Sequence, residues 1–185
     1  ICQVPRPSKK EEKMIAYLKA FGAKHNLETN VDEAGNVLIK KPATPGKENL
    51  QTVVLQSHID MVCEKNNDIQ HDFLTDPIET EIDGEWLKAK GTTLGADNGI
   101  GVATELAILA DDSIGHGPLE CLFTVDEETG LTGAFELKEG FMSGDILLNL
   151  DSEDEGEIFI GCAGGIDSVE EFAYKDVEVP AGYFF

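Results

Sequence analysis

The sequence predicts an α/β fold in which a mixed, largely parallel sheet is flanked by helices. Three short apolar runs have the character of buried strands, at residues 52–56, 119–125 and 146–150. Helical patterns alternate with them, at residues 14–21 and 100–110. Hydrophobic residues make up 41% of the 185 residues, which is enough for a packed core. Strands that alternate with helices favour the α/β class.

The first element is predicted to be a helix. Ser8 and Glu11 have the spacing of a capping box, in which each side chain satisfies a backbone N–H at the helix start. The apolar residues of 14–21 then recur on one helical face, and Gly22 is expected near the helix end. A strand is predicted at 36–40, before the run at 52–56.

The middle of the chain predicts a hairpin and a buried helix. Asp83-Gly84 is a strong turn signal between the short runs 79–82 and 86–88. The glycine-rich segment 91–99 leads into the helix at 100–110, which has little polar surface and is therefore expected to be buried.

Beyond the strand at 119–125, a short helix is predicted at 131–137 and the strand at 146–150 follows. Alternating residues predict two further strands, at 157–162 and 168–174. Gly164-Gly165 is a candidate hinge, so we assign residues 1–164 to the first domain and 165–185 to the start of a second α+β domain.

Composition excludes several classes of function. The chain has 36 Asp and Glu against 14 Lys and Arg, a net charge of −22, which would repel nucleic acid. No apolar run is long enough to span a membrane. The four cysteines are widely spaced and form no C-x-x-C pair, which favours free thiols and a cytoplasmic protein. They are Cys2, Cys63, Cys121 and Cys162.

Acidic and histidine residues follow three of the predicted core strands. His58 and Asp60 come after the first, Glu127 and Glu128 after the second, and Asp151 after the third. A further carboxylate, at position 97, opens the predicted buried helix. Because ligands bind at the carboxyl ends of strands in open α/β sheets, we expect these side chains to converge on one edge.

These residue types suit a catalytic zinc site. Zinc accepts imidazole nitrogen and carboxylate oxygen, and two metals can share a bridging carboxylate while an extra carboxylate takes a proton. Taken singly, a histidine after a strand is more often structural, and a Glu-Glu pair is more often solvated surface. Their joint occurrence at four strand or helix ends favours a site.

Several sequence strings resemble the aminoacyl-histidine (Xaa-His) dipeptidases, which are carnosinase-like members of the dinuclear zinc exopeptidase superfamily. The resemblance runs in order along essentially the whole chain, and the string at 91–101 is very specific. The strings are QSHIDMV at 56–62, KNND at 65–68, GTTLGADNGIG at 91–101, TVDEETG at 124–130, DSE at 151–153 and GCAGG at 161–165.

The resemblance implies a set of metal ligands. His58 and Asp151 would bind one metal, Asp97 would bridge both, and Glu128 would bind the second. The family uses two zinc ions, although cobalt or manganese are alternatives. The resemblance also implies a cis peptide bond between Asp97 and Asn98.

The resemblance also implies a reaction, the hydrolysis of small dipeptides, with Xaa-His favoured. A water between the metals attacks the peptide carbonyl, Glu127 acts as general base, and Asp60 orients His58 through its other ring nitrogen. The alternatives are a zinc aminoacylase or deacylase, a tripeptide aminopeptidase of the same superfamily, or a non-catalytic metal-binding module.

The family completes its second metal site with a histidine near the C-terminus of a chain more than twice this length. The remaining histidines have other expected uses, at a helix end or in loops; they are His25, His71 and His116. We therefore expect this chain to hold one metal, through His58, Asp97 and Asp151, with a weak or empty second position. We also expect little peptidase activity from it alone, and a homodimer formed through the second, lid domain.

Overall fold

The computed structural model describes residues 1–152, 154, 156–161, 164–166 and 168–175. The chain divides into two units, Ile1–Glu153 and Asp154–Phe185. The first unit contains all the helices and strands that the described residues form. None of these helices has the length and apolar character needed to cross a bilayer.

A five-stranded mixed sheet organises the first unit, as the sequence predicts. Its strands lie in the order β1 (Glu28–Val31), β2 (Val37–Lys41), β6 (Leu119–Thr124), β3 (Val53–His58) and β7 (Ile146–Asn149). The three strands β6, β3 and β7 are parallel, while β1, β2 and β6 pair antiparallel. The carboxyl ends of the three parallel strands therefore meet at one edge of the sheet.

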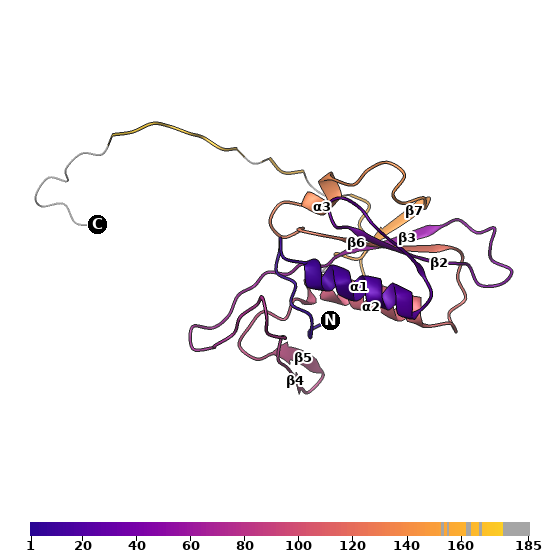
Figure 1. Ribbon diagram of the computed structural model, residues 1–185, viewed down its shortest axis with the longest axis horizontal. Helices are drawn as coiled ribbons and strands as arrows, with labels where there is room; N and C mark the ends of the chain where they lie inside the picture. Colours follow the sequence, from indigo (N-terminus) through magenta and orange to yellow (C-terminus); the bar gives the residue numbers. More distant parts are fainter. Residues whose placement is uncertain (153, 155, 162–163, 167, 176–185) are drawn as a thin grey trace, which may run out of the picture. The chain divides into compact units, whose positions relative to one another are not determined.

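Two helices, α1 (Glu12–Lys24) and α2 (Ala96–Ala110), cover one face of this sheet (Figure 1). Successive side chains of a strand point to opposite faces, so Val37 and Ile39 pack towards the helices while Leu38 packs away from them. The larger core lies between helices and sheet. Its fully buried members include Met14, Leu18, Val37, Ile39, Ile59, Val102, Cys121 and Phe123.

The opposite face has a smaller core, covered by α3 (Thr132–Phe135) and the segment that follows it (Figure 1). There, three strand residues pack against Leu137, Phe141 and Met142. The hairpin predicted around Asp83-Gly84 is present as a separate two-stranded sheet, β4 (Thr80–Asp83) and β5 (Trp86–Ala89).

Two local predictions at the N-terminal half are wrong. Ser8 and Glu11 form no capping box: the Ser8 hydroxyl donates to Asp60, and Glu11 accepts from the backbone N–H of Lys9 and of Asp126. Long-range partners have taken both side chains, so the helix begins without a side-chain cap. In addition, β3 extends to His58, so this histidine is the last residue of the strand and does not follow it.

In the second unit, the strands predicted at 157–162 and 168–174 are absent from the residues that the structure describes. Position 162, the last residue of the first predicted strand, lies outside the described residues. A strand needs a backbone partner, and the described residues of these segments make one backbone hydrogen bond, from Glu157 N to Asp154 O. Their apolar side chains, such as Ile158 and Ile160, are exposed.

Candidate metal centre

The candidate centre is built around His58, at the carboxyl end of β3. Its imidazole is fully buried and uses both ring nitrogens. Nδ1 lies 3.1 Å from Asp60 Oδ1, and Nε2 lies 2.9 Å from Asp97 Oδ1. Two further carboxylates face Nε2, with Asp151 Oδ2 at 3.7 Å and Glu127 Oε2 at 3.9 Å. Three of the sequence-predicted carboxylates, Asp97, Glu127 and Asp151, therefore converge on one nitrogen atom.

Asp60 is the buried anion on which the centre rests. Besides His58, its carboxylate accepts hydrogen bonds from the Ser8 hydroxyl at 2.7 Å and from the backbone N–H groups of Glu127 and Glu128 at 3.0 and 3.2 Å. Burial alone would raise the pKa of Asp60, but these donors outweigh it and lower the pKa to about 2. Asp60 is thus a fixed negative charge that orients the imidazole.

The loop that carries Asp97 has an irregular backbone. Gly95 has a φ of 68°, and Asp97 and Asn98 depart from helical angles before α2 becomes regular. The Asp97–Asn98 peptide bond is cis, as the resemblance implies. The Asn98 side chain is buried and accepts from Gly101 N at 3.0 Å, which joins the irregular turn to the helix. Asp97 itself is 56% exposed and reaches His58 from the open side.

A tight turn after β6 places Glu127 and Glu128. Asp126 has a φ of 50°, and its carboxylate accepts from the hydroxyls of Thr129 and Thr132, which closes the turn. The turn directs two consecutive N–H groups at Asp60. The side chains at 127 and 128 remain partly exposed, so they can meet a ligand.

The charges at the centre perturb one another. Burial raises the pKa of Glu127, of Glu128 and of Asp151, and neighbouring carboxylates raise each further. Burial would lower the pKa of His58, but its hydrogen bonds to Asp60 and Asp97 outweigh burial and raise the pKa to about 9. The carboxylates around this one imidazole therefore favour a bound cation.

The donor set fits a divalent metal. Ligand atoms of His58, Asp97 and Asp151 all lie within 4.8 Å of one another, and so do those of His58, Glu127 and Glu128. Imidazole nitrogen with carboxylate oxygen is a zinc donor set. Since Nδ1 is occupied by Asp60, His58 can offer only Nε2 to a metal.

A third acidic cluster, Glu11, Asp60 and Asp126, meets the same distance criterion. Its carboxylates already accept hydrogen bonds from backbone N–H groups and hydroxyls, including Lys9 N, Ser8 Oγ and Thr129 Oγ1. Its oxygens are therefore structural acceptors.

The other predicted histidines lie away from the centre. His25 is the C-terminal capping residue of α1 and packs on Phe21, with ring centroids 4.4 Å apart. His116 hydrogen-bonds Gly117 O at 2.6 Å, and His71 packs edge-on against Phe73. Neither loop histidine belongs to a metal-ligand group among the described residues.

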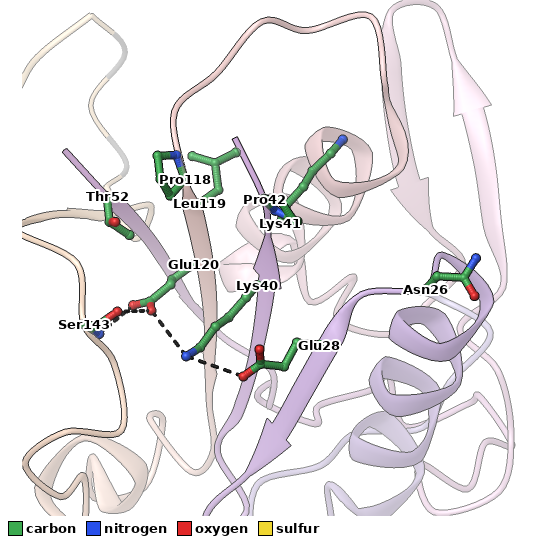
Figure 2. A pocket seen from close by; sticks show the side chains of 10 residues that line it. All are labelled: Asn26, Glu28, Lys40, Lys41, Pro42, Thr52, Pro118, Leu119, Glu120 and Ser143. Atoms are coloured by element: carbon green, nitrogen blue, oxygen red, sulfur yellow. Dashed lines mark hydrogen bonds and ion pairs between the residues drawn. The ribbon is translucent and has the colours of Figure 1, made fainter. Parts of the chain in front are cut away.

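A hollow of about 420 Å³ lies at the opposite edge of the sheet, where β3 and β6 begin. Figure 2 shows that three of its charged groups face one another: Lys40 pairs with Glu28 at 3.5 Å and with Glu120 at 3.8 Å. Glu120 also accepts from the backbone N–H and the hydroxyl of Ser143, at 2.8 and 2.6 Å. These pairs fasten the loop before β7 and leave this hollow without a free reactive group among the side chains drawn.

Sequence reasoning missed several polar residues that support the centre. Arg6 is buried against the backbone of both ligand-bearing loops, Ser8 binds Asp60, and Glu105 on α2 binds Ser57, beside His58. The sequence does single out Arg6, because it is the one arginine of the chain. The sequence also singles out Glu105, because it is the one acidic residue in the predicted apolar helix at 100–110.

The chain is similar to known proteins in both sequence and structure. The sequence is 54% identical to the cytosol non-specific dipeptidase of Escherichia coli over 183 residues, which is 99% of this chain and 38% of that protein. The structure matches an aminoacylhistidine dipeptidase from Vibrio alginolyticus with a TM-score of 0.82 and 59% identity, over 84% of this chain and 32% of that one. It also matches the aminopeptidase PepT from Bacillus cereus with a TM-score of 0.69 and 27% identity, over 83% and 41% of the two chains.

The chain thus spans little more than a third of the curated relative. A family profile matches residues 54–177, the span that contains His58, Asp97, Glu127, Glu128 and Asp151. On that match, this chain belongs to peptidase family M20/M25/M40.

Proposed function

We propose that this chain supplies most of the metal centre of a metal-dependent dipeptidase. The observation that carries the proposal is the convergence of carboxylates from three separate segments on His58 Nε2, while Asp60 holds the opposite ring nitrogen. The dipeptidase names of two relatives, at 54% and 59% identity, support the substrate class.

We assign His58, Asp97 and Asp151 to one metal, and Asp97 and Glu128 to a second, with zinc as the expected ion. The resemblance supports Asp97 as the bridging ligand, and the Asp97 carboxylate already lies 2.9 Å from the Nε2 atom of His58, which both ligand groups share. When bound, such a pair of cations polarises a peptide carbonyl and activates water. Asp60 holds the His58 ring in the orientation that presents Nε2.

We assign proton transfer to Glu127. Its carboxylate faces the centre, with Oε2 3.9 Å from His58 Nε2, and its side chain is about one-third exposed. It also borders a small hollow of about 120 Å³ with Asp151 and Leu131. From this position the carboxylate can take a proton from the attacking water and give it to the leaving amine.

The adjacent pair Glu127 and Glu128 gives a sharp test in the full-length protein. We expect Glu127→Gln to reduce dipeptide hydrolysis by about 10²–10⁴-fold with the metal content unchanged, because only the proton carrier is lost. Glu128→Gln is the matched variant, and it should lower the metal content. Hydrolysis is measured by amine release and metal by elemental analysis. Wild-type turnover in Glu127→Gln would reassign the base.

The same assay fixes substrate preference. We expect Xaa-His dipeptides to be cleaved, and the panel should include other dipeptides, a tripeptide and an N-acetyl amino acid. The tripeptide is included because of the match to an aminopeptidase. Preference for the N-acetyl amino acid would show that the protein is a deacylase that uses the same chemistry.

We assign the catalytic role to residues 1–164 and propose that 165–185 begin a lid domain through which the protein dimerises. The first compact unit, which contains every proposed site residue, supports this assignment. We also propose a cytoplasmic location, which is supported by the cytosolic name of the Escherichia coli relative and by the free thiols of Cys2, Cys63 and Cys121.

A further inference from the structure

Arg6 joins the two loops that carry the centre. Its guanidinium donates from Nη1 to Ile59 O at 3.0 Å and to Asp60 O at 2.7 Å, and from Nη2 to Gly95 O. The first two carbonyls lie directly after His58, and the third lies two residues before Asp97. One side chain thus ties together the backbones on either side of the His58–Asp97 contact.

The glycines of the 91–101 string make room for this guanidinium. A Cβ atom at Gly95 would lie 2.5 Å from Arg6 Nη2 and 2.7 Å from Met61 Sδ. A Cβ atom at Gly99 would lie 2.8 Å from the same nitrogen. A larger residue at either position would displace the guanidinium, so these two glycines leave the space that Arg6 occupies.

Arg6 is a costly residue to bury for packing alone. It is only 3% exposed, burial lowers its pKa, and it forms no carboxylate ion pair within the described residues. A planar guanidinium can reach several carbonyls at fixed angles, which the point charge of a lysine cannot do. Its partners are the carbonyls of the two ligand loops. Ser8, two residues along, holds the Asp60 carboxylate at 2.7 Å.

We propose that Arg6 is a positioning residue that sets the separation of His58 and Asp97 for metal binding. This inference rests on the proposed metal centre. Without the guanidinium, the loop after β3 and the segment at the start of α2 lose their common hydrogen-bond donor. His58 and Asp97 are then no longer held at the separation that the metal requires. Residues that orient metal ligands typically change metal affinity by about 10–100-fold.

The test is a cobalt(II) titration of the full-length, metal-stripped protein, followed by the visible absorption of the bound ion. We expect Arg6→Met to weaken cobalt binding at least about 10-fold and to change the shape of the absorption band, with Arg6→Lys in between. Lys41→Met is the matched control. Lys41 is also a buried cation that donates to two carbonyls, Ile108 O at 3.1 Å and Asp111 O at 2.8 Å, at the far end of α2.

The control should lower the melting temperature of the metal-free protein and leave cobalt affinity and spectrum unchanged. Wild-type affinity and spectrum in Arg6→Met, or an equal loss in Lys41→Met, would overturn the positioning role. If Arg6→Met does not fold, Gly99→Ala displaces the guanidinium while keeping its charge, and the same two readouts decide. His58→Ala separates the proposals: if it binds cobalt like wild type, the metal centre itself is wrong.

Discussion

Replacing Glu105 with glutamine tests whether a neutral carboxyl lies in the core behind the candidate centre. Glu105 is fully buried on α2, and its Oε1 accepts from the Ser57 hydroxyl at 2.6 Å. Its Oε2 has no hydrogen-bond partner among the residues that the structure describes. Burial raises the pKa of Glu105 well above the ordinary value, so the folded protein retains a proton that the unfolded chain releases.

The sign and size of the effect follow from this difference. A carboxyl whose folded pKa is raised contributes stability that is complete below its unfolded pKa and is lost as the pH rises towards the folded pKa. Within that window each pH unit removes about 1.4 kcal/mol from the free energy of unfolding. Between pH 5.5 and 7.5 the stability therefore falls as the pH rises, for as long as the folded carboxyl keeps its proton.

The assay is urea unfolding of the full-length protein at pH 5.5, 6.5 and 7.5, with a chelator present. Glutamine has no proton to lose, so the stability of Glu105→Gln relative to wild type should improve as the pH rises, by at most about 1.4 kcal/mol for each pH unit. Glu120→Gln is the control, because that buried carboxylate already has Ser143 donors and Lys40. A Glu105→Gln difference that stays constant with pH would refute the reasoning.

Three further predictions concern the anion beside the histidine, the core and the edge strand β7. Asp60→Asn should weaken zinc binding by about 10–100-fold in a competition titration, because the charge that orients His58 is removed; unchanged affinity would show that the backbone alone places the ring. Phe123→Ala should lower the free energy of unfolding by about 3–5 kcal/mol, since Phe123 is fully buried between sheet and helices. Leu147→Ala, on the half-exposed strand β7, should cost about 1 kcal/mol in the same urea experiment.

The predictable parts of the fold are those that periodicity and burial determine together. Strands β3, β6 and β7 were predictable because each is a short apolar run beside turn residues. The strand β1, Glu28–Val31, was not, because its ETNV sequence is polar and it pairs with β2 alone at the sheet edge. An edge strand is defined by its neighbour, which the local sequence does not contain.

The same distinction applies to the centre. Placement at strand ends, and for Asp97 at a helix start, predicted that His58, Asp97 and Asp151 would meet, because parallel strands end at one edge. It did not predict Arg6 or Ser8, whose partners lie more than 50 residues away. The Ser8-to-Glu11 spacing indicated a local cap, but Ser8 donates to Asp60 after β3, and Glu11 accepts from the backbone of Asp126 after β6. Local patterns cannot report a competition that only the tertiary structure creates.

Asp60 holds the turn after β6 through hydrogen bonds from two main-chain N–H groups, and these bonds do not depend on which side chains the two residues carry. Every residue except proline carries the N–H that Asp60 accepts at positions 127 and 128. The turn would therefore stay bound to Asp60 when the side chains at positions 127 and 128 are exchanged. During evolution, the acidic residues at positions 127 and 128 could therefore be replaced by other residues without loss of the turn. Such a protein could gain a different activity or lose activity altogether.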